Sequence, residues 1–224
     1  MSKVVNPFAH RLGILRDWRH RWFAVGAKYQ EYLKADILLR EYLLKGLRGM
    51  YIGGLEIERN DKTLRVVIKT SRPGLIIGRS GEGSTKLRNK ISTFLKKKKL
   101  HAPEIKLDIE EIRSPESNAA IVAYMVAEGL EKRMPFRRVL KQTIEKVMAN
   151  RDVKGVRISV AGMLGGGSMS RVEELKKGRV PLQTFRSDID FAKERANLPL
   201  GVIGVKVWIY RGEVFEADAK EARK

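Results

Sequence analysis

The chain contains no cysteine among its 224 residues, which excludes disulfide bonds, thiol chemistry and zinc sites built on cysteine. Only three histidines occur, His10, His20 and His101, and no two of them have a metal-ligand spacing such as H-x-x-x-H. We therefore expect neither a metal site nor a cofactor, and nothing in the sequence requires an oxidising compartment.

Long apolar runs are also missing. The run from Ala119 to Ala127 is among the longest, and it is far shorter than the ~20 residues that span a bilayer. The N-terminus has no apolar core of the kind that a signal peptide carries. We expect a soluble, intracellular protein that does not enter a membrane.

Acidic residues are scarce relative to basic ones, because 26 Asp and Glu stand against 46 Lys and Arg, a formal net charge of +20. So basic a chain is expected to bind a polyanion, either nucleic acid or an anionic membrane surface. Its 43% hydrophobic content indicates a folded chain rather than a disordered basic tail. The length allows one large domain or two small ones.

Residues 1–27 are predicted to form a basic-aromatic arm. Its cations alternate with aromatic side chains, a pattern suited to phosphate contacts and to stacking on unpaired bases. In a second interpretation the tryptophans close a small hydrophobic lid over the helix that follows, and the sequence leaves both open. The candidate RNA-binding residues of the arm are Arg11, Arg16, Trp18, Arg19, Arg21 and Trp22.

Residues 28–112 have the pattern of one α+β domain. Apolar residues at 29, 33, 37, 44 and 47 follow helical spacing, and strand-like alternation comes after them. The predicted order is helix 28–48, strands 55–58 and 63–70, a short helix from Pro73, helix 82–99 and a strand over 105–109. This αββααβ order is typical of the type II KH fold, which binds RNA.

The string Gly78-Arg79-Ser80-Gly81 lies between the two paired helices of this domain. Its G-x-x-G spacing lets a tight turn pass close to a ligand, and the free N–H groups of the next helix favour a phosphate. KH domains clamp about four nucleotides by their backbone with such a loop. The spacing alone is more typical of an ordinary loop, and the position between paired helices makes it a candidate RNA-binding site.

The same string also approaches a P-loop, because Gly78 to Thr85 reads G-x-x-x-x-G-S-T. A P-loop requires lysine directly after its last glycine, and Ser84 occupies that place. Nucleotide hydrolysis is therefore disfavoured.

Residues 113–215 are predicted to form a second α+β domain with two helices and a mainly antiparallel sheet. Ser114-Pro115 is a good helix start, and glycines at 165–167 and 178 punctuate a hairpin-like stretch. Residues 216–224 are expected to be a mobile charged tail. The expected helices cover roughly 115–132 and 135–150, and the expected strands 153–161, 180–190 and 202–210.

The helix from Pro135 carries a candidate phosphate-binding stripe. Apolar residues at 136, 140, 144 and 147 share a face that must pack inward, while Arg137, Arg138 and Lys141 lie at its flank and back. We expect no acidic partner nearer than Glu145. An ordinary solvated helix face is the alternative, and the net charge favours a phosphate-binding surface. Arg171, Arg179 and Arg186 either extend this basic surface or are simply solvated.

Catalytic residues are not predicted. Carboxylate pairs occur at 110/111, 173/174 and 188/190, but no histidine or metal constellation accompanies them. We expect a protein that is not an enzyme, with a nuclease or lyase acting on nucleic acid as a remote alternative. A free-standing KH regulator of single-stranded RNA is the nearer one.

Several motifs resemble those of the bacterial-type small-subunit ribosomal protein S-three family, and they cover nearly the whole chain. They are VNP at 5–7, RLGI at 11–14, GLIIGRSG at 74–81, FRR at 136–138, GRVPL at 178–182, RSDID at 186–190 and GVIGVKVWI at 201–209. The resemblance implies a type II KH domain followed by an α+β domain, seated in the head of the small subunit against ribosomal RNA and neighbouring ribosomal proteins. It implies a cytoplasmic ribosome, with an organellar one as the open alternative.

The resemblance also implies a contact with mRNA. The family residues that match Arg137, Arg138 and Lys141 line the mRNA entrance and help to open structured mRNA. Two departures stand out: Ser80 occupies a loop position that is usually basic, and Glu174-Leu175 replaces the usual Trp-Tyr pair. Both put the corresponding RNA or packing contacts in doubt.

Overall fold

The computed structural model describes residues 5–60, 62–98, 100 and 104–215, so the predicted tail at 216–224 lies outside the described residues. The chain divides into two compact units. The KH unit comprises residues 18–113, and the C-terminal unit comprises residues 1–17 together with 114–224. The residues expected to form one N-terminal arm are thus shared between the two units.

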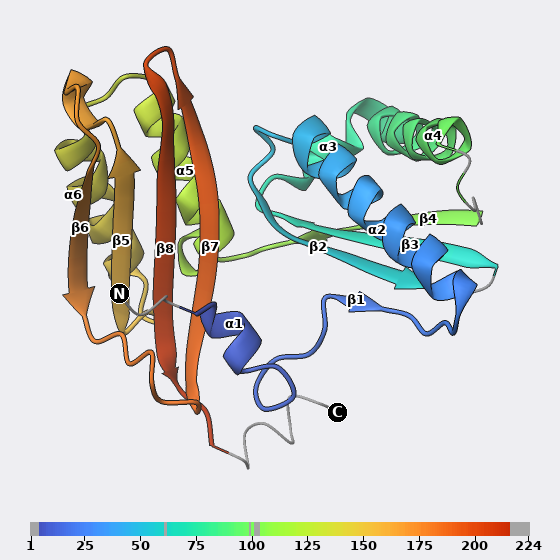
Figure 1. The fold of residues 1–224 in the computed structure, drawn as a ribbon, viewed down its shortest axis with the longest axis horizontal. Helices are drawn as coiled ribbons and strands as arrows, with labels where there is room; N and C mark the ends of the chain where they lie inside the picture. Colours follow the sequence, from blue (N-terminus) through green and yellow to red (C-terminus); the bar gives the residue numbers. More distant parts are fainter. Residues whose placement is uncertain (1–4, 61, 99, 101–103, 216–224) are drawn as a thin grey trace. The chain divides into compact units, whose positions relative to one another are not determined.

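The KH unit contains one sheet with strand order β1-β2-β3-β4 (Figure 1). β2 and β3 are antiparallel, whereas β1 and β4 run parallel to their neighbours. α2 and α4 lie on one face of the sheet and share a core with it (Figure 1). The order from α2 to β4 is αββααβ, which confirms the predicted fold. The elements are β1 (His20–Arg21), α2 (Ala27–Gly46), β2 (Ile52–Arg59), β3 (Thr63–Thr70), α3 (Pro73–Ile77), α4 (Glu82–Lys97) and β4 (Glu104–Glu111).

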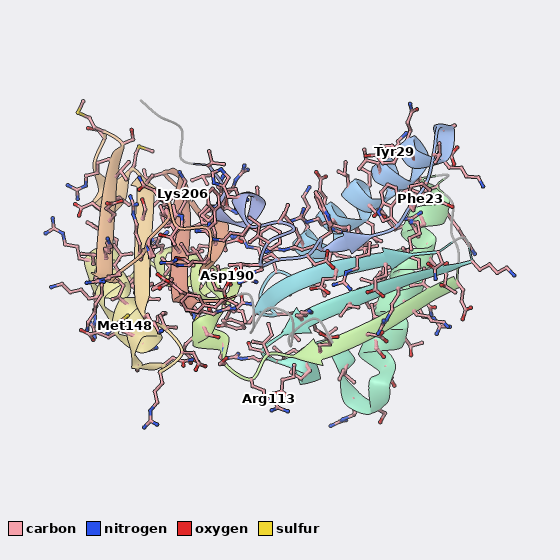
Figure 2. All side chains as sticks on the ribbon, turned by 90° about the horizontal axis from the view of Figure 1, so that it is seen from below. Phe23, Tyr29, Arg113, Met148, Asp190 and Lys206 are labelled. Atoms are coloured by element: carbon pink, nitrogen blue, oxygen red, sulfur yellow. The ribbon has the colours of Figure 1, made fainter. Side chains whose placement is uncertain are left out.

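α2 buries a different face from the one that its apolar spacing predicted. The side chains at 29, 33, 37 and 44 are 40–51% exposed, and Tyr29 is labelled in Figure 2. Of the predicted stripe only Leu47 is buried. The helix has apolar residues on two faces, so its period could not decide which face meets the sheet. The buried face consists of Tyr32, Ala35, Asp36, Leu39 and Leu43.

The C-terminal unit has one antiparallel sheet with strand order β6-β5-β8-β7. α5 and α6 pack against one face of this sheet (Figure 1), and their apolar side chains form a single core with β5, β7 and β8. Two helices on an antiparallel sheet confirm the predicted architecture. The elements are α1 (Pro7–His10), α5 (Ala119–Glu131), α6 (Phe136–Ala149), β5 (Gly155–Gly162), β6 (Arg171–Gly178), β7 (Ser187–Leu198) and β8 (Gly201–Glu213).

The strand expected over 180–190 was largely wrong. β7 begins only at Ser187 and continues to Leu198. Pro181, in the segment before it, lacks the N–H that a sheet ladder needs. β6 was not predicted as a strand, because it is an edge strand with mostly exposed side chains and therefore lacks an apolar alternation.

The start of α5 also differs from the prediction. Ser114-Pro115 leads only into a 3₁₀ turn over Pro115–Ser117. The side chain of Asn118 caps α5 instead, accepting hydrogen bonds from the backbone N–H groups of Ala120 and Ile121.

Candidate nucleic-acid interface

The start of α6 gathers three cations, two of them in the first turn, where an α-helix least favours positive charge. Arg137, Arg138 and Lys141 lie within the first six residues of the helix. No side chain caps this end, since the N-cap is Pro135, and no acidic residue lies in the first turn. A helix N-terminus carries about half a positive charge, so Arg137 and Arg138 in the first turn are each unfavourable by roughly 0.3–1 kcal/mol, an effect that fades before Lys141. Such a local disadvantage is typical of a functional site, and this one suits an anion.

Arg137 has an acidic neighbour that the sequence did not predict. Its Nη2 lies 3.7 Å from Oε1 of Glu173 on β6, and Nε of Arg171 lies 3.8 Å from the same oxygen. The expectation of no acidic partner nearer than Glu145 was therefore wrong, because β6 and α6 meet only through the tertiary fold. Arg138 and Lys141 are exposed and, over the described ranges of the chain, have no ion-pair partner.

Arg171 joins this group through the ring of Phe136. The guanidinium carbons of Arg137 and Arg171 lie 5.6 and 5.4 Å from the ring centroid, within cation–π range. Arg137, Arg138, Lys141 and Arg171 thus form one group, which we call the α6 cationic surface.

Arg179 and Arg186 do not belong to the α6 cationic surface. The length of β6 separates Arg171 from Arg179, roughly 26 Å at 3.3 Å per residue. Nε of Arg186 donates to Oε2 of Glu213 at 2.6 Å. Both arginines are exposed, so they are candidates for a separate contact.

Glu174 and Leu175, the pair noted above as a departure from the family pattern, both have partners within the C-terminal unit. Glu174 accepts a hydrogen bond from Nη2 of Arg157 at 2.6 Å, and Leu175 packs against the core of the C-terminal unit. Neither position offers a ring on which a base could stack.

The G-x-x-G loop lies between α3 and α4, as predicted, and exposes both of its variable residues. Gly78 and Gly81 have φ values of +69° and +78°, which favour glycine. Ser80 has a φ of 54°, which is uncommon for a residue with a Cβ. Arg79 is the only cation of the loop, so the attraction for phosphate at this site rests on one side chain.

Gly83, just inside α4, is a structural requirement that sequence reasoning missed. A Cβ at this position would lie 2.5 Å from the carbonyl oxygen of Ile76 and 2.8 Å from that of Ile77. The glycine therefore lets α4 begin directly against the end of α3. In the sequence, the only indication was that Gly83 is the last glycine of the P-loop-like string 78–85. Ser84, which occupies the place of the P-loop lysine, donates to the carbonyl of Gly81 at 2.7 Å.

Arg11 is fully buried, with 0% of its surface exposed, and burial lowers the pKa of its guanidinium. Its Nε donates to the carbonyl of Ser187 at 2.6 Å, and Nη1 donates to that of Pro7 at 2.9 Å. Nη2 donates to the carbonyls of Leu182 and Thr184 at 3.2 and 2.8 Å. Arg11 therefore holds the N-terminal segment on the C-terminal unit, and this burial removes it from the candidate RNA contacts.

The R-S-D-I-D motif at 186–190 holds the same segment by charge. Oδ1 of Asp188 accepts from Nη2 of Arg16 at 2.6 Å, with both side chains partly buried. Asp190, labelled in Figure 2, accepts from the backbone N–H of Ala119 at 2.9 Å, at the start of α5. The two aspartates of this motif, which carried part of the family resemblance, thus have structural roles.

Trp22 is a structural residue of the KH unit. Its Nε1 donates to Oδ2 of Asp36 at 2.6 Å, and its ring lies against Tyr29 and Tyr32. Asp36 also accepts from Nη2 of Arg59 at 2.8 Å in a buried ion pair. Burial outweighs both partners and raises the pKa of Asp36. Trp22 therefore fits the second interpretation of the arm, in which the tryptophans close a lid over the helix that follows.

Three other residues of the arm lie at or near the surface. Trp18 is 64% exposed, Arg19 is half-buried, and Arg21 is exposed with its Nη1 3.8 Å from Glu58. Between them, burial lowers the pKa of His20. Trp18, Arg19 and Arg21 stay candidates for an RNA contact.

Of the carboxylates considered for catalysis, Glu173, Glu174, Asp188 and Asp190 have the basic or backbone partners described above, and Oε2 of Glu110 lies 3.6 Å from Nζ of Lys69. In the part of the chain that the structure describes, no group of three or more His, Asp or Glu side chains could hold a metal ion. None of the described helices combines the length and the apolar character needed to cross a membrane.

The αββααβ unit with its G-x-x-G loop defines a KH-domain protein of the α+β class. Residues 38–117 match the family described as KH domain, and residues 126–209 match the family described as ribosomal protein S3, C-terminal domain. Over its full length the chain is similar to bacterial proteins named small ribosomal subunit protein uS3. The chain belongs to the ribosomal protein S3 family.

Three relatives show how far this similarity extends. The protein of Ectopseudomonas mendocina is 41% identical over 223 residues, which cover 100% of this chain and 95% of the relative. That of Methylococcus capsulatus is 42% identical over 216 residues, covering 96% and 94%. That of Parvibaculum lavamentivorans is 44% identical over 218 residues, covering 97% and 89%.

Proposed function

We propose that this protein is a structural constituent of the small ribosomal subunit that binds ribosomal RNA and neighbouring ribosomal proteins in the subunit head. Membership of the ribosomal protein S3 family supports this role, and the net charge of +20 suits a polyanionic partner. The family is structural, and the chain is not an enzyme. The residues proposed to contact ribosomal RNA are Trp18, Arg19, Arg21, Arg79, Ser80, Arg179 and Arg186.

Sedimentation tests this proposal. The tagged protein, expressed in cells whose own copy is depleted, is expected to co-sediment with small subunits in a sucrose gradient. Its recovery at the top of the gradient would instead favour a free-standing KH regulator.

We further propose that the α6 cationic surface lines the mRNA entrance and assists the unwinding of incoming mRNA. One observation carries this proposal: Arg138 and Lys141 are exposed cations beside Arg137 at an uncapped helix start with no acidic residue in its first turn, an arrangement that favours an anion. Phosphates of a separated strand supply that anion. The chain lacks a P-loop lysine, so the work of strand separation comes from translocation of the mRNA.

The triple variant Arg137→Ala, Arg138→Ala, Lys141→Ala is expected to slow translation of hairpin-containing messages several-fold and to spare unstructured ones. The reason is that the lost contacts hold single-stranded backbone. For the isolated chain, the slope of log K against log salt concentration for single-stranded RNA is expected to become less steep by about 2, because each lost phosphate contact removes about 0.7. Translation rates on reconstituted subunits and binding titrations at several salt concentrations measure the two effects.

A matched control removes the same charge elsewhere. Lys28→Ala, Lys34→Ala and Lys45→Ala together alter exposed positions of α2, and the ratio of the two translation rates is expected to stay unchanged. Equal slowing of structured and unstructured messages by the α6 variant would contradict the unwinding role.

Ser80→Lys is expected to tighten binding of single-stranded RNA to the KH unit. The position is exposed, and a second cation in the loop adds one phosphate contact, so the salt slope is expected to steepen by about 0.7. Asn89→Lys adds the same charge on α4 outside the loop and is the control. An identical gain from both variants would show that the loop has no special part in binding.

A further inference from the structure

A pocket of about 680 Å³ opens beside the α6 cationic surface. Its lining includes Phe136, Arg137, Leu164, Gly165, Met169 and Arg171. Sites for small organic groups typically enclose about 300–1,000 Å³ and combine apolar walls with a few polar groups. The pocket has the size and the mixed lining of such a site.

The chemistry of the lining suits a flat, electron-rich ring. Two guanidinium groups lie 5.6 and 5.4 Å from the centroid of the Phe136 ring, and Glu173 lies within 4 Å of both. Guanidinium planes and aromatic faces are the surfaces on which unpaired bases stack. Leu164 and the exposed thioether of Met169 supply apolar contact.

The glycine-rich loop at 165–167 lies beside the Phe136 ring. Gly165 has a φ of +68°, and a Cβ built on it would lie 3.7 Å from Cε1 of Phe136. This distance is an ordinary van der Waals contact, so the backbone at Gly165 lies beside the ring. A side chain at Gly165 would carry the strain of a positive φ.

We propose that the Phe136 pocket holds one unstacked base of single-stranded RNA while Arg138 and Lys141 hold the adjoining phosphates. The inference rests on the proposed role of the α6 cationic surface and adds a stacking subsite to it. A paired base is stacked in its duplex and cannot enter, so the pocket favours separated strands. The strand is preferred over a free nucleotide because the cations of the surface continue past the pocket along α6.

Comparing an oligouridine with an abasic sugar-phosphate chain of equal length isolates the base. Phe136→Leu keeps an apolar side chain in the core and removes the stacking face. It is expected to weaken oligouridine binding about tenfold and to leave abasic binding and the salt slope unchanged, since stacking contributes about 1–3 kcal/mol per base. Fluorescence anisotropy on the full chain measures both. An equal effect on the two ligands, or none on either, would overturn the proposal.

A loss of affinity can also result from misfolding, so a second variant tests the same site by a gain of affinity. Met169→Trp adds a stacking surface at the rim, where Met169 is 84% exposed, and is expected to tighten oligouridine binding several-fold without affecting the abasic chain. Val172→Trp is the control, because successive residues of a strand face opposite sides and Val172 therefore faces away from Arg171 and Glu173. Equal gains from both tryptophans would refute the pocket.

Two further outcomes separate this inference from the function on which it rests. If the α6 triple variant leaves the salt slope unchanged, the proposed phosphate contacts are wrong. The difference between oligouridine and the abasic chain in Phe136→Leu still tests the base pocket by itself. Free uridine monophosphate is expected not to displace the oligouridine. Displacement at low concentration would assign the pocket to a mononucleotide and overturn the strand proposal.

Discussion

Replacing Arg11 with alanine is expected to destabilise the C-terminal unit by about 3 kcal/mol and to release the N-terminal segment from it. Arg11 is 0% exposed and donates to four backbone carbonyls, three of them more than 170 positions away in sequence. Alanine leaves those acceptors without their partner, two of them in buried and two in partly buried surroundings. These carbonyls can regain hydrogen bonds from water only if the N-terminal segment moves away from the C-terminal unit.

Hydrogen exchange read by mass spectrometry is the suitable measurement, because a chain of two units need not unfold in one transition. Exchange is expected to accelerate over residues 7–17 and 182–190 and to stay unchanged over α2. Arg16→Ala is the matched control: its ion pair with Asp188 is partly solvated, so the expected cost is about 1 kcal/mol or less. Equal, small effects from the two variants would show that Arg11 does not anchor the segment.

Replacing Gly83 with alanine is expected to cost the KH unit about 3 kcal/mol and to displace the G-x-x-G loop. The added Cβ would meet the carbonyl oxygens of Ile76 and Ile77 at 2.5 and 2.8 Å. These are backbone atoms at the end of α3, so they cannot rotate away as a side chain can. α3 and α4 must separate, and the loop that joins them moves with them.

The measurements are hydrogen exchange over residues 73–97 and the affinity for single-stranded RNA, which is expected to fall as exchange rises. Gly74→Ala, in α3, provides the control, since a Cβ there meets nothing within 4 Å. It is expected to be neutral or to stabilise by about 0.4–1 kcal/mol, because alanine restricts the unfolded chain. If Gly83→Ala is as neutral as Gly74→Ala, a Cβ at residue 83 fits between α3 and α4 and the prediction is wrong.

The KH order and the position of its loop were predictable because each depends on residues close in sequence. Helical period, strand alternation and the turn residues Gly78 and Gly81 are local signals. The same signals failed for α2, which has two apolar faces, and for β6, whose exposed side chains carry no alternation. Period identifies an element but does not choose between two faces that are equally apolar.

The candidate site divides in the same way. Arg137, Arg138 and Lys141 were found from helical spacing and net charge, and the structure adds that the helix end they occupy has no cap. The roles of Arg11 and Trp22 were not predictable, because a buried arginine and an exposed one look alike in a basic segment. Only the carbonyls at 182, 184 and 187 and the carboxylate of Asp36 distinguish them.

Composition and local pattern were sufficient for the expectation of a polyanionic partner, the α+β class, the KH order and the positions of the cations. Each follows from the identity of a residue and a few of its neighbours. Tertiary structure alone decided which arginines are buried, that Glu173 reaches Arg137, and that a pocket forms around Phe136. These features join α6 to β6 and the N-terminal segment to β7, and contacts between distant parts of a chain exist only once it has folded.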